Sequence, residues 1–355
     1  MVAVELLESH HVVACDHGVA GLSGRAVGEG RCMPGSSPLV LIIRLDGIGD
    51  ALALTPLLAA LQHDGIAADV VLRPANAGVF ASRAVRRVVV AEFALRSGSA
   101  QDLAAVESLG RDLRGEGYTH VLVATEDPSG YRLARATAAP QRVGFYNGWG
   151  KPFKSLWTRR FLTQRIYRSA GLDRRAPHEC EVLFRLGSSL TSEREPAKAA
   201  ARLRPLVLDD EPSRDERIAV QITDKWERSG MTQQDVIATI AAISATTPVR
   251  ALASRTESVY ARSLARDAGI EIEVFDAIAP WKNAIASARG VVAPDSGAVH
   301  VAGMTGTPVV AVFPVSRELR LQTARWAPWA APYRIVEASA RWPQRVQSAL
   351  SELLP

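Results

Sequence analysis

The chain alternates short apolar runs with stretches of helical periodicity, and it does so in two separate sets. The first set predicts strands over Leu39–Arg44, Ala68–Leu72 and His120–Ala124, a short apolar segment at Arg87–Val90, and helices over Ala51–His63 and Gln101–Gly115. Strands that alternate with helices make right-handed crossovers and form a parallel sheet covered by helices. The first set therefore predicts a doubly wound α/β domain.

The second set repeats this pattern. It predicts strands over Ile218–Ile222, Val249–Ala253, Glu271–Phe275, Gly290–Ala293 and Pro308–Phe313, and helices over Thr232–Ala245, Glu257–Ala268, Trp281–Ala288 and Ala298–Thr305. A polar, proline-bearing stretch separates the two sets and is a plausible hinge. We therefore expect two Rossmann-like doubly wound domains that face each other across a cleft.

The domain boundaries follow from these patterns. We expect an N-terminal extension over 1–37, a first Rossmann-like domain over 38–190, a linker over 191–216, a second Rossmann-like domain over 217–335, and a C-terminal helix over 336–355 that packs back on the first domain. Ligands of such sheets bind outside the carboxyl ends of the strands. The loops that follow strands are therefore where we look for chemistry.

Composition limits the class of protein. The chain has 355 residues, of which 47% are hydrophobic, so it can bury a large core. It has no apolar run of about 20 residues, which a membrane span needs, and its first residues lack the pattern of a secretory signal. We therefore expect a cytoplasmic protein. Cys15, Cys32 and Cys180 are too scattered for a disulfide framework and are expected to be reduced thiols.

The net charge of +5 is concentrated in one segment. Lys151–Arg175 contains two lysines and six arginines around four aromatic residues. This segment is typical of a basic amphipathic surface for a phosphorylated or membrane-bound partner. The alternative is an ordinary solvated face with aromatic side chains packed beneath it.

The turn after the first strand carries an unexpected carboxylate. Gly47 and Gly49 begin a dinucleotide-binding pattern, but Leu52 stands at the third glycine position. Asp50 would place a negative charge where a pyrophosphate should meet free N–H groups at a helix start. A nicotinamide-dependent dehydrogenase is therefore disfavoured, and Asp50 needs another explanation.

A second loop has the properties of an anion site. Ser296 and Gly297 follow a strand and begin a short helix, with His300 in its first turn. The free N–H groups, the serine hydroxyl, the helix dipole and the histidine suit a diphosphate. Lys225 follows the first strand of the same set and could add a cation. Alternatively, Asp295 or Ser296 only caps the helix and His300 is structural.

The stretches "IIRLDGIGDALALTPLLAAL", "ITDKW" and "DSGAVHVAGMTGTPVVAVF" together resemble the heptosyltransferases of glycosyltransferase family 9, which add heptose to the inner core of lipopolysaccharide. Two weaker matches, "RVGF" and "HECEVLFRL", lie between them, and all five occur in the family's order from about Leu39 to Phe313. The resemblance implies a GT-B fold and an inverting mechanism without a metal or cofactor. It also implies that the donor substrate is ADP-L-glycero-β-D-manno-heptose.

The resemblance assigns roles to the residues that match its motifs. Asp50 corresponds to the proposed general base, which takes the proton of the acceptor hydroxyl. The departing diphosphate would be stabilised by a set that replaces a metal: Lys225, Ser296, Gly297 and His300. Asp295 is expected to orient its loop, and Asp46 to hold the turn or to make Asp50 a stronger base through its charge. Glu257 would bind the ribose hydroxyls, or would only be a helix-start glutamate.

The acceptor is expected to bind the first domain. The candidate residues, all basic, are Arg142, Lys151, Lys154, Arg159 and Arg160, which suit the phosphates and carboxylates of an anionic glycolipid such as Kdo-lipid A. We therefore expect a nucleotide-sugar donor, a glycolipid acceptor, a peripheral contact with the cytoplasmic face of the inner membrane, and no nucleic acid.

Two parts of the chain depart from the family. After Phe313 the family's glycine-proline-threonine stretch is replaced by "PVSRELRLQTARW", and residues 1–37 have no counterpart. The histidines and cysteines of those first residues (His10, His11, Cys15, His17 and Cys32) fit no zinc pattern, so a flexible extension is favoured over a metal cluster. Two alternatives stay open: the same fold and donor chemistry with another sugar, protein or metabolite acceptor, and a non-catalytic sugar-nucleotide-binding module.

Overall fold

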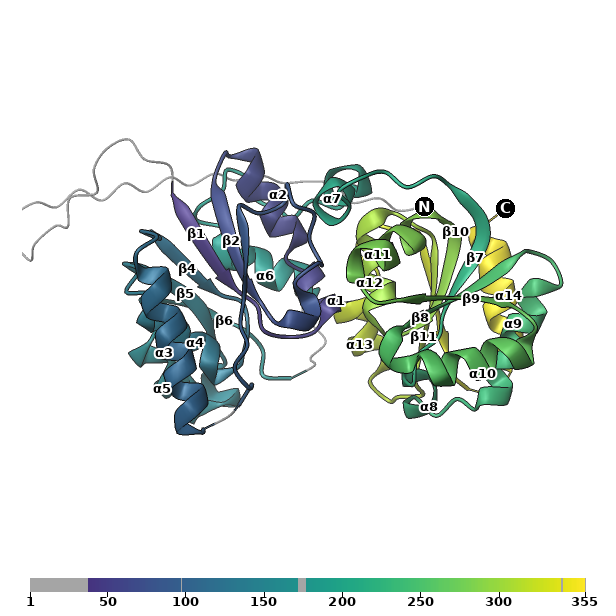
Figure 1. Cartoon of the computed structure of the whole chain (residues 1–355). Coiled ribbons are helices and arrows are strands. Elements are labelled where there is room, and N and C mark those ends of the chain that lie inside the picture. The colour runs from purple at the N-terminus through teal and green to yellow at the C-terminus, as the bar shows by residue number, and fades with distance from the viewer. Residues whose placement is uncertain (1–37, 97, 172–176, 340, 355) are drawn as a thin grey trace, which may run out of the picture. The chain divides into compact units, whose positions relative to one another are not determined.

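Two six-stranded parallel sheets form the framework of the protein (Figure 1). The structure is a computed structural model, and it describes residues 38–96, 98–171, 177–339 and 341–354. The strand order is β3-β2-β1-β4-β5-β6 in the first sheet and β12-β11-β10-β7-β8-β9 in the second. In each sheet the order reverses beside the first strand of its set, so each sheet has one topological switch point.

The first sheet uses residues before 170. Its strands are β1 (Leu39–Ile43), β2 (Ala67–Leu72), β3 (Arg87–Val90), β4 (His120–Val123), β5 (Gln141–Tyr146) and β6 (Gln164–Tyr167). Its helices are α1 (Ile48–Leu52), α2 (Thr55–His63), α3 (Ala100–Arg114), α4 (Pro128–Ala136), α5 (Pro152–Trp157) and α6 (Glu179–Gly187), with short 3-10 turns η1 (Pro74–Asn76), η2 (Gly148–Gly150) and η3 (Thr158–Arg160). Strand β1 is buried along almost its whole length, as a central parallel strand requires.

The second sheet follows after α7 (Ala200–Val207). Its strands are β7 (Asp215–Gln221), β8 (Val249–Ser254), β9 (Glu271–Phe275), β10 (Ala288–Pro294), β11 (Val309–Phe313) and β12 (Tyr333–Glu337). Its helices are α8 (Lys225–Arg228), α9 (Gln233–Ser244), α10 (Ser258–Ala268), α11 (Ile278–Ser287), α12 (Gly297–Thr305), α13 (Leu319–Trp326) and α14 (Trp342–Leu353), with the turn η4 (Arg255–Glu257).

The helix predicted over Ala51–His63 is two helices in the structure. Helix α1 begins before the predicted start, at Ile48, and α2 begins at Thr55. The break occurs because Pro56 lacks an amide hydrogen for an uninterrupted helix, and the Thr55 hydroxyl donates to the Leu52 carbonyl at 2.6 Å. The early start matters, because it places Asp50 inside the first turn of α1.

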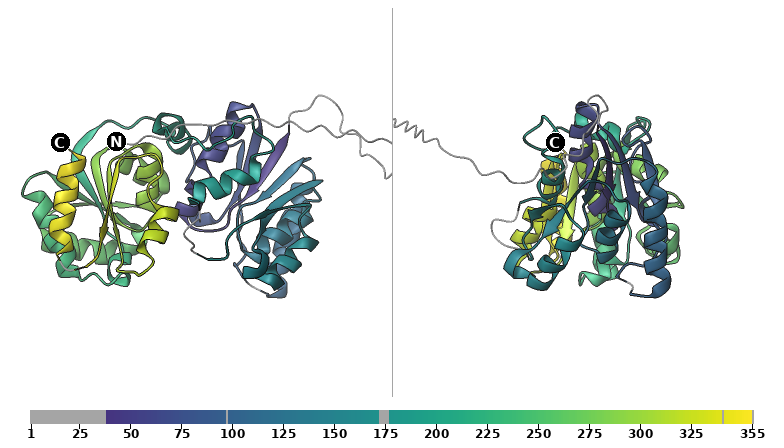
Figure 2. Two further views of the ribbon diagram at one scale, coloured as in Figure 1. Left: turned by 180° about the vertical axis from the view of Figure 1, so that it is seen from behind. Right: turned by 90° about the vertical axis from the view of Figure 1, so that its left-hand side faces the viewer.

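Two expectations about the outer segments differ from the structure. The C-terminal helix does not pack on the first sheet, because α14 contacts α9, β11 and β12 of the second, and Figures 1 and 2 show it in yellow beside that sheet. Its apolar face, which includes the buried Val346 and Leu350, belongs to the second core. The stretch 191–216 contains α7, whose Leu203 and Val207 are fully buried. It is therefore a packed connection rather than an exposed linker.

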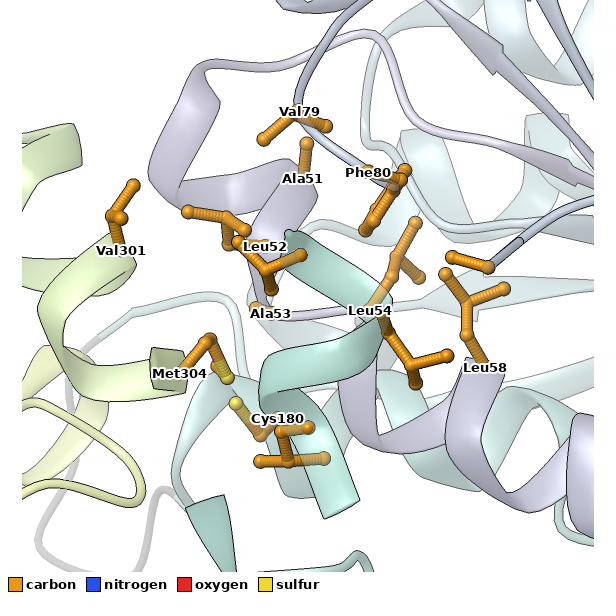
Figure 3. Close-up of a cluster of buried hydrophobic side chains, with 14 of the residues drawn as sticks. Ala51, Leu52, Ala53, Leu54, Leu58, Val79, Phe80, Cys180, Val301 and Met304 are labelled. Carbon is orange, nitrogen blue, oxygen red and sulfur yellow. The ribbon is translucent and has the colours of Figure 1, made fainter. Parts of the chain in front are cut away.

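One apolar core runs from the first sheet to the second. Val40 of β1 and Val291 of β10 belong to the same cluster of buried residues. Figure 3 shows its central part, where Leu52 of α1 and Cys180 of α6 lie beside Met304 and Val301 of α12. The described residues accordingly belong to a single compact unit.

Three sequence-based expectations concern other parts of the chain. No helix among the described residues is long and apolar enough to cross a membrane. The histidines and cysteines of the first 37 residues, and the end of the basic segment at 172–175, lie outside the described residues. Cys180 is described, and it is a free, buried thiol whose pKa burial raises well above its ordinary value.

Candidate active site

The predicted site residues follow the strands that flank the two switch points. In the first sheet, β1 and β4 are neighbours, and the Asp46–Asp50 turn follows β1. In the second sheet, β7 and β10 are neighbours, and they are followed by Lys225 and by Asp295–Gly297. Because parallel strands end at the same edge, each pair of loops is brought together at a switch point.

Arg44, at the end of β1, holds the first of these loops. Its side chain is 2% exposed and donates to the Ala124 carbonyl after β4. It also donates from Nε to the Asp50 carbonyl at 3.0 Å and from NH2 to Asp50 Oδ1 at 2.8 Å. A buried guanidinium thus fixes both the backbone and the carboxylate of Asp50, a role for Arg44 that no motif in the sequence indicated.

Asp50 is oriented and still accessible. Its Oδ2 accepts the Gly47 amide at 3.1 Å, while 34% of its side chain stays exposed. Asp50 does not cap its helix, because Gly47 is the N-cap residue and Asp50 is the third helical residue. Its bond to Gly47 does support the start of α1. The exposed part of the carboxylate is available to a substrate.

Glu179 is a further residue whose role the sequence did not reveal. It begins α6 and is fully buried among three arginines. Arg168 NH2 lies 2.9 Å from both carboxylate oxygens, Arg325 NH2 lies 3.0 Å from Oε2, and Arg44 NH2 lies 3.4 Å from Oε1. Despite its burial, these guanidinium charges hold the pKa of Glu179 below its usual range. Arg325 comes from α13, so this cluster links α13 to the Asp50 turn.

The loop after β10 presents an unsatisfied hydroxyl. Ser296 is the N-cap residue of α12, but its side chain makes no capping hydrogen bond. Its Oγ is buried and has no hydrogen-bond partner among the described residues. The capping alternative is therefore wrong for Ser296, and a buried polar atom without a partner points to a ligand.

Lys225 bridges the second switch point. It is exposed, and its Nζ donates to the Asp295 carbonyl at 3.0 Å. The bond uses one of the three ammonium hydrogens and places the charge beside the start of α12. Asp295 itself is anchored by its amide, which donates to the Val312 carbonyl at 3.0 Å.

Burial and the charge of Asp50 both affect the pKa of the Asp295 carboxyl. Burial raises its pKa above the ordinary value, the Asp50 carboxylate raises it further, and Lys225 opposes both. The direction shows that negative charge is already costly in this loop. The resemblance implied that Asp295 orients its loop. Its amide bond to Val312 and the bond from Lys225 to its carbonyl both hold the backbone of that loop.

His300 lies against the Asp50 turn. It is 8% exposed, and burial lowers its pKa to about 3, with smaller contributions from the charges of His178 and Lys225. At neutral pH it is therefore an uncharged imidazole with a single N–H donor. A Cβ on Gly49 would lie 2.3 Å from His300 Cδ2, so only glycine permits this approach of α1 to α12.

Two neighbouring cavities share Ile48, Lys225, Ser296 and Gly297 in their linings. The smaller, of 220 Å³, also contains Asp50, His300 and Trp326. The larger, of 430 Å³, extends over Glu257, Phe275 and Trp281. The structure thus brings all the predicted donor residues and the predicted base to one continuous site.

Glu257 has a defined position in the larger cavity. Its Oε1 accepts from the Thr223 hydroxyl at 2.6 Å and from the Asp224 amide at 3.0 Å, and its Oε2 accepts from Ser254 Oγ at 2.9 Å. It therefore ties the loop after β7 to the loop after β8. Oε1 already accepts two hydrogen bonds, so Oε2 is the oxygen that can accept a further one.

Residues 278–354, from α11 to α14, match the model of glycosyltransferase family 9 (heptosyltransferase). Over these residues the match agrees with the resemblance to family 9. The matched segment includes Ser296, Gly297 and His300 of the site. A comparison with curated proteins finds no match.

Solved structures confirm the GT-B fold. A family 9 glycosyl transferase from Veillonella parvula superposes with a TM-score of 0.70 at 14% identity, covering 89% of this chain and 97% of that one. E. coli heptosyltransferase WaaC with ADP gives 0.68 at 19% identity, covering 88% and 99%. E. coli ADP-heptose lipopolysaccharide heptosyltransferase II gives 0.65 at 16% identity, covering 89% and 98%. Identities this low establish the fold alone.

A second polar cluster lies at the carboxyl edge of the first sheet. Glu126, which follows β4, pairs with Lys151 at 3.1 Å and with Lys154 at 3.2 Å. These cations, with Arg168 and the Asn147 amide, overcome burial and lower the pKa of Glu126 to about 2. Asn147 Oδ1 and Arg168 Nε are buried without a hydrogen-bond partner among the described residues, and Lys154 Nζ has hydrogens to spare beyond its ion pair with Glu126. The cluster therefore has unused donors and acceptors for a ligand.

The other three predicted acceptor residues lie elsewhere. Arg142 stands at the amino end of β5, and its side chain donates to the Phe161 carbonyl at 2.7 Å and to the Ala139 carbonyl at 2.5 Å. Arg159 and Arg160 are in η3, which precedes β6, and Arg160 lines a different cavity. These positions are at the amino edge of the sheet, so the expectation that these three residues meet the acceptor is not supported by their placement.

Proposed function

We propose that the protein is an inverting heptosyltransferase that moves heptose from ADP-L-glycero-β-D-manno-heptose to a lipopolysaccharide inner-core acceptor. One observation carries the proposal. Asp50, the candidate base, and Lys225, Ser296 and Gly297, the candidate diphosphate ligands, line a single 220 Å³ cavity. A base and a leaving-group site within one small cavity suit a displacement at the carbon that lies between them.

In the proposed step, Asp50 accepts the proton of the acceptor hydroxyl while the oxygen attacks the anomeric carbon. The bond from that carbon to the diphosphate breaks, and its electron pair leaves with ADP. Attack on the face opposite the leaving group inverts the anomeric configuration. Arg44 holds the carboxylate in place through a 2.8 Å bond, and the exposed part of Asp50 receives the proton.

The charge that develops on the diphosphate would be met by protein groups, without a metal or a cofactor. Lys225 supplies the cation, Ser296 its unpartnered hydroxyl, and the first turn of α12 its free amides. His300 contributes at most one neutral N–H, because its pKa of about 3 keeps it uncharged. Turnover in the presence of EDTA tests this point, and a strict requirement for added magnesium or manganese would contradict it.

The nucleoside would occupy the 430 Å³ cavity. Phe275 and Trp281 offer apolar surface for a base, and Glu257 offers its Oε2 to a ribose hydroxyl. Structures of WaaC with ADP and with ADP-2-deoxy-2-fluoro heptose have the same fold and support an ADP-linked donor. Replacing Glu257 with Gln should weaken binding of ADP more than binding of inorganic diphosphate, which lacks the ribose.

The acceptor would bind the cluster around Glu126, Lys151 and Lys154, whose ammonium groups suit phosphates and carboxylates. A membrane contact would lie beside it, because Trp149 is 94% exposed and Phe153 is 89% exposed. Exposed aromatic side chains next to lysines favour a lipid interface. Replacing Phe153 with Ser should lower binding to vesicles that contain the lipid acceptor and leave ADP affinity unchanged.

A different sugar or acceptor is the alternative that the structure favours next. Trp326 of α13 lines the small cavity, and α13 lies within the segment that departs from the family pattern. A bulky residue there can change which sugar fits. Incubation with a panel of ADP-sugars and truncated lipopolysaccharide acceptors distinguishes the two: transfer of heptose supports the first proposal, and transfer of another sugar alone supports the second. A non-catalytic module would bind ADP and transfer nothing.

A further inference from the structure

A second basic cavity lies outside the proposed active site. It has a volume of 570 Å³ and is formed by α3, α4 and η3 of the first sheet. Its charged lining residues are Glu107, Arg111, Arg114, Arg132, Arg135 and Arg160. We call it the arginine pocket. The arginines of α3 lie in its last turn, and η3 precedes β6, so the pocket is near the amino edge of the sheet.

The local sequence explains how the arginines are gathered. Glu107, Arg111 and Arg114 are spaced by one or two turns of α3 and share one face, as do Arg132 and Arg135 on α4. The two helices approach closely where Gly110 meets Ala136, since a Cβ on Gly110 would lie 2.3 Å from the Ala136 Cβ. The close approach brings both arginine rows to one cavity.

The charge in this pocket is not compensated. None of its five arginines forms an ion pair within the part of the chain that the structure describes, and Glu107 is its one acidic lining residue. Arg86 and Arg87, on the same sheet, are instead paired with Asp69 and Glu116. Uncompensated guanidinium groups that share one cavity raise its positive potential and attract anions.

Aromatic rings form one wall and limit how the arginines can move. The Arg132 guanidinium lies 5.9 Å from the centre of the Trp157 ring, and Arg135 lies 5.9 Å from Phe161. The two rings are 4.4 Å apart, and Arg142 braces them through the Phe161 carbonyl. Burial lowers the pKa of Arg142, and the like charge of Arg135 lowers it further. A guanidinium group that lies over an aromatic ring can still donate its N–H groups to an oxyanion.

We propose that the arginine pocket binds a ligand carrying several phosphate groups, at a site separate from the donor cavity. Several guanidinium forks in one cavity suit adjacent phosphates, which accept paired N–H bonds. The volume of 570 Å³ is sufficient for more than one phosphate. Two sources present this chemistry, a soluble oligophosphate and the headgroups of anionic phospholipids, and the experiment below separates them.

The first arm of the test uses tripolyphosphate and isothermal titration calorimetry on the full chain, with ADP at saturation to block the donor cavity. The variant is Arg132→Gln/Arg135→Gln. The matched control is Arg262→Gln/Arg266→Gln, which removes the same charge from two exposed positions of α10. We expect one tripolyphosphate per chain, affinity weakened roughly tenfold or more in the variant, and no change in the control.

The second arm measures co-sedimentation with phosphatidylglycerol vesicles, with phosphatidylcholine vesicles as reference. If the pocket variant loses phosphatidylglycerol binding and the control keeps it, the phosphate groups come from lipid. If only tripolyphosphate binding is lost, the ligand is soluble. Either result supports the pocket. The proposal is overturned if the pocket variant matches the wild type in both arms, or if the α10 control loses as much binding as the pocket variant. Circular dichroism checks that each variant is folded. Both arms measure binding, so the result does not depend on whether heptose transfer occurs.

Discussion

Gly49 and His300 lie so close together that a methyl group on Gly49 would clash with the imidazole ring. A Cβ on Gly49 would lie 2.3 Å from His300 Cδ2 and 2.8 Å from Nε2. Gly49 belongs to α1 and precedes Asp50, and His300 belongs to α12, which begins at Gly297 next to Ser296. The glycine therefore sets the distance between the candidate base and the candidate leaving-group site.

Replacing Gly49 with Ala should lower turnover by about 100-fold, the scale on which a displacement of about 1 Å affects catalysis. The matched control is Gly78→Ala, because its Cβ would meet Ile278 Cβ at an ordinary 3.6 Å. Steady-state kinetics on both variants make the comparison. Equal activity in the two would show that α1 and α12 need not approach this closely.

Glu179 should stabilise the fold through its three arginines. Glu179→Gln leaves buried guanidinium charges without compensation, so the free energy of unfolding should fall by about 3–5 kcal/mol. The control is Glu181→Gln, since Glu181 is half-exposed and lies 3.9 Å from Lys198. Urea denaturation measures both. A loss no larger than that of the control would mean that the arginine cluster does not depend on this carboxylate.

Lys225 should act mainly on the donor. Lys225→Ala removes the one cation that lines both donor cavities, and the loss of transition-state stabilisation should be about 2–4 kcal/mol in kcat/KM. Lys198→Ala, at an exposed position outside these cavities, is the control. If donor affinity and rate are unchanged in Lys225→Ala, the residue only anchors the Asp295 carbonyl.

The raised pKa of Asp295 predicts a pH dependence of ADP binding. Because its neutral form persists above the ordinary carboxyl value of about 3.9, lowering the pH removes its charge before other carboxylates lose theirs. ADP affinity should therefore rise as pH falls through that raised pKa, more in the wild type than in Asp295→Asn. The difference between the two proteins cancels the titration of ADP itself. Parallel curves from neutral pH down to the ordinary carboxyl range would rule out Asp295 as the titrating group.

The sequence predicted the long buried strands well, and the short charged ones poorly. Strands β1 and β11 are continuous apolar runs, so their pattern is unambiguous. Strands β5, β6 and β12 were not predicted, because arginines interrupt their apolar residues. Strands β6 and β12 are edge strands, which carry charge to avoid further pairing.

The site shows the same division. Asp50, Lys225 and Ser296 each follow a strand, so their places at the carboxyl ends of the two sheets, and hence at the expected cleft, could be predicted. The link between Arg44 and Glu179 could not, because 135 residues separate them. A charged residue at the end of the apolar run "LVLII" was the available signal, since a buried charge needs a partner. Nothing in the sequence identified which carboxylate that partner would be.

Asp50→Asn tests the central claim most directly. Asparagine keeps the shape of the side chain, and its Oδ1 can still accept from Arg44, but it cannot take a proton. If Asp50 is the base, turnover should fall by about 10²–10⁴-fold. Calorimetric ADP binding should survive in the same variant, because the change removes a negative charge from the cavity. Near-normal turnover in a folded Asp50→Asn protein would contradict the account.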